Sequence, residues 1–277
     1  MPKQGPETDG EVLKIHEQAG VAWVTLARPD RLNAMSRPLI QGLKNYFTEL
    51  YDRRDIRVVV LAGEGRAFCA GLDLKEQSQT PISASVGGAL DEQRAVRDIM
   101  VAMRRCPQPI ISIVQGAASG GGFALALASD IRLLTPDARL NAAFIRLGLS
   151  GCDVGVSYFL PRMVGSSVAA EYLLTGRFMS AERAFALGLA SWVGELKELH
   201  AEARSLVTDM LRATPLGLRL TKEALGLAID LPSLDAVIAL EDRNQILCVR
   251  DADFSEGVAA FLEKREPRYS SSTEENQ

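Results

Sequence analysis

Apolar residues follow two patterns along this chain: short continuous or alternating runs in its first two thirds, and helical spacing beyond them. VLKIHE and VAWVTLA flank Ala19 and Gly20 and predict a β-hairpin. VVVLAG (58–63) and PQPIISIVQG (107–116) contain unbroken apolar runs, as parallel strands covered on both faces do. DIRLLT and ARLNAAF predict two further short strands.

Helices are predicted between and after these strands. Leu39, Leu43 and Phe47 recur at helical spacing behind Ser36, a residue type that favours the N-cap position. A second helical period covers 91–104, and Ser180 is expected to cap a later helix. The last part of the chain is expected to be almost entirely helical, with helices at 198–213, 216–229, 232–249 and 255–265.

These patterns predict an α/β fold, with a core at 11–195 and a helical C-terminal region at 196–268. Both ends of the chain, 1–10 and 269–277, are polar and rich in turn-forming residues, so we expect them to be disordered. No Rossmann fingerprint accompanies the strands.

Composition narrows the function classes. Hydrophobic residues make up 47% of the 277 residues and charged residues 24%, values typical of a soluble globular protein. The formal charge of −4 provides no basic face, so neither a nucleic acid nor an anionic membrane is an expected partner. No apolar run reaches the roughly 18 residues that span a bilayer, and the N-terminus lacks a signal-peptide core. We therefore expect a cytoplasmic protein.

Histidines and cysteines offer little chemistry. The chain has two histidines, His16 and His200, and neither lies in a catalytic motif. The four cysteines form no C-x-x-C pair and have no histidine nearby, which argues against a metal site. A mechanism with a histidine base, or one with a bound metal, is therefore not expected.

Two glycine turns form the strongest candidate site. In SGGGFALALASDIR, glycines precede an apolar helix, and the first amides of a helix have no intrahelical partner, so the N–H of Gly121 could donate to an anionic oxygen. GEGRAFCAGLDLKE follows strand 58–63 and contains a second turn before Leu72. Loops after parallel strands meet at one edge of a sheet, where ligands bind. The amides of Leu72 and Gly121 are thus predicted to form an oxyanion hole. Close packing of a helix on the sheet is the alternative explanation for the glycines.

Four stretches of the chain, in their order along residues 11–267, resemble the crotonase, or enoyl-CoA hydratase/isomerase, superfamily. They are RAFCAGLDLKE, PIISIVQGAASGGGFALALASDIR, VTLARPDRLNAM and EGVAAFLEKR. The resemblance implies a spiral of ββα units with a helical C-terminal region that forms trimers, often paired as a dimer of trimers. It implies an acyl-CoA thioester as substrate, with coenzyme A as part of that substrate and no permanently bound cofactor. The thioester oxygen would lie between the Leu72 and Gly121 amides.

The same resemblance implies five coenzyme A contacts. Arg31 precedes LNAM in the stretch that flanks coenzyme A in the family, Ala70 lies in the segment that accepts the adenine, and Lys75 fits a basic position of the same motif. Phe261 and Lys264 match an aromatic residue and a lysine contributed by a neighbouring subunit. A solvated helix charge is the alternative for Lys264.

The two glutamates of the family's hydratases are missing here. Their positions carry Ala124 and Phe144, neither of which can transfer a proton. Water addition to a double bond requires a pair of carboxylates, so a standard two-glutamate hydratase is contradicted by the residues themselves. We instead expect Phe144, with Phe123 and Met100, to line an apolar acyl tunnel.

Asp153, in LGLSGCDVGVSYFLPR, is the remaining candidate acid–base. Related dienoyl-CoA isomerases hold an aspartate at a very similar D-V-G. The alternative is an aspartate that caps a helix at 154–163.

Three functions remain open: an isomerase-type enzyme with weak or absent hydration, a non-catalytic acyl-CoA binder, and an enzyme with Asp153 as nucleophile. The first is preferred. The third is ranked last because no histidine is placed to activate water.

Overall fold

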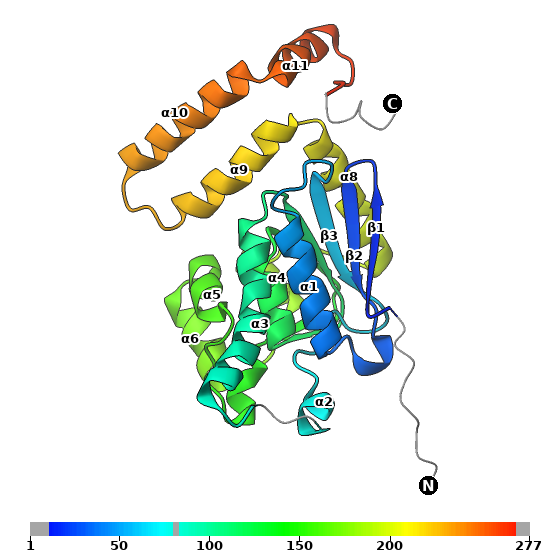
Figure 1. The fold of residues 1–277 in the computed structure, drawn as a ribbon, viewed down its shortest axis with the longest axis vertical. Coiled ribbons are helices and arrows are strands. Elements are labelled where there is room, and N and C mark those ends of the chain that lie inside the picture. Colours follow the sequence, from blue (N-terminus) through cyan, green and yellow to red (C-terminus); the bar gives the residue numbers. More distant parts are fainter. Residues whose placement is uncertain (1–10, 80–82, 270–277) are drawn as a thin grey trace.

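A computed structural model of the chain describes residues 11–79 and 83–269. Its main sheet has six strands in the order β1-β2-β3-β4-β6-β9 (Figure 1). β1 pairs with β2 in antiparallel fashion, and every later pairing is parallel. The strands of this sheet are Leu13–Gln18 (β1), Val21–Leu26 (β2), Val58–Gly63 (β3), Ile110–Val114 (β4), Ile131–Leu134 (β6) and Trp192–Val193 (β9).

A second sheet of three short strands gives the fold its spiral character. It contains β5 (Ala117–Ser119), β7 (Arg139–Asn141) and β8 (Met179–Ser180) in the order β5-β7-β8. The chain passes from β4 in the first sheet to β5 in the second, and again from β6 to β7. Because the chain alternates between the two sheets in this way, the ends of successive strands lie beside one another. Loops that are distant in sequence are thereby brought together.

Helices cover both faces of the main sheet (Figure 1). One face carries α1 (Arg37–Glu49), α3 (Val86–Arg105) and α4 (Gly121–Ala128), and every residue of α4 is buried. α8 (Leu196–Leu211) covers the other face through Leu199, Ala203 and Val207. Because both faces are covered, β3 is apolar throughout and β4 is apolar except for Ser112, as their continuous sequence runs predicted.

Local signals predicted several boundaries correctly. The turn of the β1–β2 hairpin has left-handed φ values of 50° at Ala19 and 78° at Gly20. Ser36 caps α1 by accepting from the amide of Leu39, and Ser180 caps α7 (Ala181–Ala186) by accepting from the amide of Arg183. These hydroxyls satisfy amides that the first turn of each helix leaves without a backbone partner.

Two predicted boundaries were wrong. α3 begins at Val86 rather than at residue 91, because Ser85 accepts from the amide of Gly88 and caps the helix there. In ARLNAAF, only Arg139–Asn141 is a strand, and Ala143–Leu147 forms a 3-10 helix, η2. This turn carries Phe144 into the core, which an extended chain pairing with the sheet would not do.

The C-terminal helices extend from the α/β body (Figure 1). They are α9 (Pro215–Ala228), α10 (Leu234–Arg250) and α11 (Ala252–Glu263). α10 buries none of its residues within the described chain, although Ile246 and Leu247 are apolar. Tyr269, the first residue of the tail that we expected to be disordered, is instead packed into the fold, where its hydroxyl donates to the carbonyl of Arg212.

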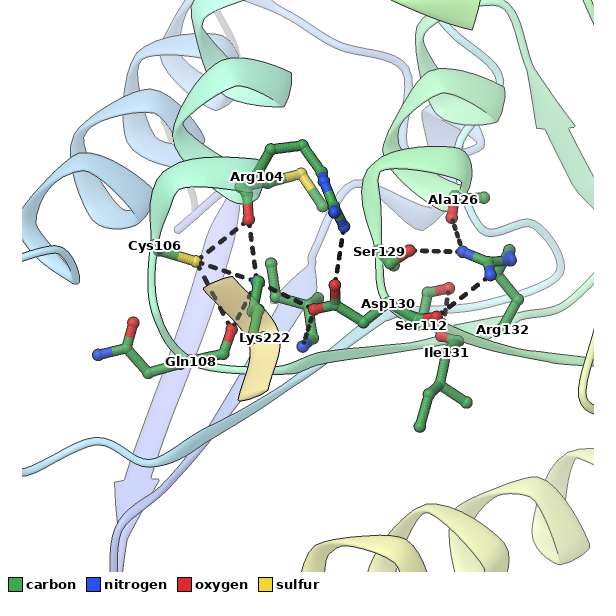
Figure 2. A network of polar contacts seen from close by, with 12 residues as sticks. Arg104, Cys106, Gln108, Ser112, Ala126, Ser129, Asp130, Ile131, Arg132 and Lys222 are labelled. Carbon is green, nitrogen blue, oxygen red and sulfur yellow. Dashed lines mark hydrogen bonds and ion pairs between the residues drawn. The ribbon is translucent and has the colours of Figure 1, made fainter. Parts of the chain in front are cut away.

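A buried polar network fixes α9 to the body (Figure 2). Lys222 is the one buried residue among 215–228, all of which the structure describes. Its Nζ donates to the carbonyl of Gln108 at 2.7 Å and lies 2.9 Å from Oδ2 of Asp130. The other oxygen of Asp130 accepts from Arg104 at 2.8 Å. Asp130 thus orders the chain around β4 and β6.

The described helices give no membrane-spanning segment, since none combines sufficient length with an apolar sequence. The remaining elements are η1 (Pro29–Arg31), α2 (Leu74–Gln79), α5 (Val156–Val164) and α6 (Ser166–Thr175).

Candidate active site

The glycine turn after β3 runs between two other segments. On one side, Cys69 exchanges backbone hydrogen bonds with β5: its amide donates to Ala117 and its carbonyl accepts from Ser119. On the other side, the amide of Met35 donates to the carbonyl of Gly71 at 2.7 Å. The turn is therefore held on both edges, as a short strand would be.

Two amides beside this pairing, those of Leu72 and Gly121, take no part in it. Within the described chain, no backbone carbonyl accepts from the amide of Leu72 or from that of Gly121, the first residue of α4. The two turns lie side by side, because a Cβ atom on Gly71 would be 3.5 Å from the Gly121 nitrogen. The structure therefore brings the two predicted donors together and leaves both without a backbone acceptor.

Each of the three glycines makes room for a different neighbour. A Cβ atom on Gly122 would lie 2.1 Å from the carbonyl oxygen of Cys69, and one on Gly121 would lie 2.7 Å from Sδ of Met35. Gly120 has a left-handed φ of 53°, and its Cβ would lie 3.3 Å from the ring of Phe144. The alternative of close packing is thus correct for Gly122, while Gly121 also presents its free amide.

The positions of the family's two glutamates are apolar in the structure as well as in the sequence. Ala124 is fully buried in α4. Phe144 is buried in the main core, with its ring beside Gly120 at the start of that helix. Hydrocarbon therefore lies next to the glycine turn at both positions where a hydratase would place a carboxylate.

Asp153 is half-buried in the loop before α5, a helix that packs on α4. One carboxylate oxygen, Oδ1, accepts from the amide of Val154 at 2.8 Å and from the side-chain amide of Gln93 on α3. The N-cap of α5 is Gly155, and no side chain caps this helix. The alternative of Asp153 as the cap of this helix is therefore wrong, and no hydrogen bond within the described chain occupies its Oδ2.

Gln93 is a site residue that the sequence did not indicate. It lies on the exposed face of α3, among charged residues that form ion pairs: Glu92 with Arg37, and Asp98 with Lys44. A polar residue on such a face looks solvated in the sequence. Only the approach of the Asp153 loop to α3 gives it a partner.

Arg31 and Lys75 line one polar cleft of about 620 Å³, together with Arg28, Asp30 and Asp73. The cleft reaches the glycine turn, since Asp73 is the residue after Leu72. Ala70 lies beside this region, with its amide donating to the carbonyl of Leu32 at 3.0 Å. Three of the five predicted coenzyme A contacts are thus close together.

Asp73 holds its own loop. Its carboxylate accepts from the amides of Lys75 and Glu76 and forms an ion pair with Arg28 at 2.9 Å. Burial opposes the charge of this carboxyl, but the hydrogen bond from Glu76 and the contact with Arg28 outweigh burial and lower the pKa of Asp73 below its usual value.

Phe261 and Lys264 are not part of this cleft. They lie at the end of α11, where the Phe261 side chain is 83% exposed. Figure 1 shows α11 at the far end of the molecule from α2, the helix that follows the glycine turn. One subunit therefore does not bring these two residues to its own site.

The three residues of the predicted acyl tunnel, Phe123, Phe144 and Met100, all belong to the main core. Met100 also lines a cavity of about 890 Å³ between α3, α5 and α9, which Phe123 and Phe144 do not line. Val154 and Gly155, which follow Asp153, line the same cavity. Charged side chains, including Arg97 and Arg104 of α3, share this lining with the apolar residues.

The histidines lie elsewhere, and neither contacts the glycine turns. His16 is exposed on β1, and His200 stacks on Trp23 with ring centroids 5.9 Å apart. Burial lowers the pKa of His200. Among the described residues, no group of three or more potential ligands is arranged to hold a metal ion.

Comparison with known proteins shows the family of this chain. The family model described as "Enoyl-CoA hydratase/isomerase" matches residues 16–272. The chain is 37% identical to "Probable enoyl-CoA hydratase EchA12" of Mycobacterium tuberculosis (strain ATCC 25618 / H37Rv), covering 95% of this chain and 93% of the relative. It is 34% identical to the 1,2-epoxyphenylacetyl-CoA isomerase of Escherichia coli (strain K12), covering 94% and 98% of the two chains.

Solved structures show the same fold. The enoyl-CoA hydratase from Bacillus anthracis superposes with a TM-score of 0.87 at 30% identity, covering 94% of this chain and all of that one. The region that the family model matches, residues 16–272, includes both glycine turns, the Asp153 loop and the C-terminal helices. This chain therefore belongs to the enoyl-CoA hydratase/isomerase family of the crotonase superfamily.

Proposed function

We propose that this protein is an enzyme that stabilises the enolate of an acyl-CoA thioester. The thioester oxygen accepts hydrogen bonds from the amides of Leu72 and Gly121 and gains negative charge as a proton leaves the acyl chain. The observation that carries the proposal is the pair of adjacent amides that no backbone carbonyl uses. Removing one donor of this kind typically costs about 10²–10³ in rate.

Asp153 is the proposed acid–base. Its Oδ1 is held by Gln93 and Val154, which leaves Oδ2 to exchange a proton with the substrate. In a double-bond migration, this oxygen removes a proton from one carbon, and the electron pair moves toward the thioester to form the enolate. The protonated carboxyl then gives a proton, which can first exchange with solvent, to a different carbon of the extended enolate, so that no other reactant is consumed.

Hydration is proposed to be weak or absent. Adding water requires one group to take a proton from the water and another to protonate the α-carbon. Ala124 and Phe144 can do neither, and Phe144 places a ring beside Gly120. A single carboxylate next to apolar walls suits proton transfer between carbons better than activation of water.

Coenzyme A is proposed to enter as part of the substrate, with no permanently bound cofactor. Its contacts in the polar cleft would be Arg31, Ala70 and Lys75. Phe261 and Lys264 would come from a neighbouring subunit, in a homotrimer or a dimer of trimers. Their distance from the cleft of their own chain and the exposed apolar residues of α10 and α11 support this arrangement.

Two assays with wild-type protein and Asp153→Asn test the function. The first measures hydration of crotonyl-CoA, and the second measures isomerisation of a 3-enoyl-CoA together with deuterium uptake from D₂O at the α-carbon. We expect little hydration, clear isomerisation or exchange, and its loss in Asp153→Asn. Rapid hydration that survives in Asp153→Asn would overturn the assignment.

The second candidate is a non-catalytic acyl-CoA binder, favoured by the absence of a carboxylate at Ala124 and Phe144. Tight binding of an acyl-CoA with no deuterium uptake in the wild-type protein would select it. Deuterium uptake that depends on Asp153 would eliminate it.

A further inference from the structure

We infer that Met35 is a positioning residue that sets the spacing of the two amides proposed to hold the thioester oxygen. This inference rests on the proposed function, because it concerns the geometry of the proposed oxyanion hole. Met35 lies in the segment between η1 and α1, far in sequence from both donors. It contacts each donor-bearing turn by a different part of its structure.

The main chain of Met35 orients Leu72. The Met35 amide donates to the carbonyl of Gly71 at 2.7 Å, and the Met35 carbonyl accepts from the amide of Asp73 at 3.1 Å. These are the residues on either side of Leu72, so the two segments form a parallel bridge at Met35 and Leu72. In such a bridge, the N–H of the central residue points to the opposite edge. The Leu72 amide is therefore directed away from Met35.

The side chain of Met35 reaches the other donor. A Cβ atom on Gly121 would lie 2.7 Å from Sδ of Met35, so the thioether occupies the space beside this glycine. Met35 is 1% exposed, which leaves its side chain no solvent-filled volume into which it could move. The thioether therefore packs against the first turn of α4, while the main chain of the same residue pairs with Leu72.

One residue thus links two turns that have no connection in sequence. Its main chain fixes the Leu72 edge, and its side chain supports the start of α4, where Gly121 presents its amide. Shortening the side chain removes the support at Gly121 but leaves the bridge to Leu72 in place. The distance between the donors is then free to change, and misplacement by about 1 Å can cost on the order of 10² in rate.

The test compares Met35→Ala and Met35→Leu with wild-type protein. Met103→Ala is the matched control, because Met103 is also fully buried in the main core but lies on α3, whereas Met35 is the methionine beside Gly121. The readout is the infrared C=O stretch of a ¹³C-labelled acyl-CoA thioester in its complex with each protein. A carbonyl that accepts two hydrogen bonds absorbs at a lower frequency than the free thioester, so the shift reports the donors directly. Isomerisation or exchange is measured in parallel.

We expect a downshift in wild-type protein that Met103→Ala retains and that Met35→Ala largely loses. The turnover number of Met35→Ala should fall by about tenfold to a hundredfold, with KM changed by less than about threefold. Met35→Leu, which conserves volume, should fold and give an intermediate shift. If Met35→Ala does not fold, the infrared shift of Met35→Leu tests the role of Met35.

A wild-type downshift that both Met35 variants reproduce in full would overturn the role of Met35 while leaving the proposed function intact. The absence of any downshift in the wild-type complex would instead overturn the proposed oxyanion hole, and the role of Met35 with it.

Discussion

Gln93 and Asp153 are sixty residues apart in the chain and hydrogen-bonded in the fold, with the amide nitrogen of Gln93 donating to Oδ1 of Asp153. The contact connects α3 to the loop before α5. It fixes the orientation of the one carboxylate that we propose to exchange protons with the substrate, and it leaves the second oxygen of that carboxylate available.

Gln93→Leu should lower the rate of deuterium exchange on the order of tenfold, since a hydrogen bond to a charged group contributes about 1.5–3 kcal/mol. Acyl-CoA affinity should change little, because the lost contact orients Asp153 rather than holding coenzyme A. Gln41→Leu is the control: Gln41 is also exposed and also donates to one side chain, that of Asn45 on the same helix, α1. Equal exchange rates in the two variants would contradict a role for Gln93.

Gly122→Ala should destabilise the protein by at least about 3 kcal/mol, since the new methyl group would overlap the Cys69 carbonyl and both partners are main chain. The measurement is the urea midpoint. Gly87→Ala is the matched control, because a Cβ atom at this helical position meets nothing within 4 Å. It should change stability by no more than about 1 kcal/mol, in the stabilising direction. Similar midpoints for both variants would show that the tight contact at Gly122 is absent.

Lys222→Met should lower the free energy of unfolding by about 3 kcal/mol, the lower end of the range for removing one partner of a buried ion pair. The loss is moderated because Asp130 keeps its contact with Arg104 (Figure 2). Urea denaturation compares this variant with Lys197→Met, which replaces an exposed lysine on α8. The comparison separates the effect of losing a buried charge from the effect of losing any lysine charge. If Lys222→Met matched Lys197→Met, the network would not stabilise the attachment of α9.

The lowered pKa of Asp73 predicts that the free energy of unfolding depends on pH in the acidic range. Its folded-state pKa lies below the usual value of 3.8, so as pH falls the unfolded chain takes up the proton first. The stabilisation from this carboxylate is therefore complete above pH 3.8 and is lost as pH falls through the lower, folded-state value. Asp73→Asn should be less stable than wild type near neutral pH and should show a weaker loss of stability below pH 3.8. Parallel curves of unfolding free energy against pH would refute this.

The apolar surface of the C-terminal helices predicts self-association. Ile246 on α10 is 62% exposed in the single chain, and placing a charge there should break the proposed trimer. Sedimentation should give a trimer or hexamer for wild type and smaller species for Ile246→Glu. Val86→Glu, which alters an exposed apolar residue at the start of α3, should leave the assembly unchanged. A wild-type monomer would contradict the proposed contribution of Phe261 and Lys264 from a neighbouring subunit.

Local patterns in the sequence determined most of the elements and the family. Continuous apolar runs identified β3 and β4 because parallel strands are buried on both faces. Ser36 and Ser180 identified helix starts because their hydroxyls satisfy nearby amides. The sequence also shows that neither Ala124 nor Phe144 can transfer a proton, since residue identity alone decides whether a side chain can titrate.

Tertiary structure alone decided which residues meet. The contact of Gln93 with Asp153 and that of Met35 with Gly121 depend on how segments pack after long stretches of chain, and neither has a local sequence signal. The single buried residue of α9 is a lysine for the same reason: Asp130 and the Gln108 carbonyl, which lie just before β6 and β4, compensate its charge. Helical and strand periods are set by neighbours in sequence, whereas the positions of these polar and thioether groups are set by neighbours in space.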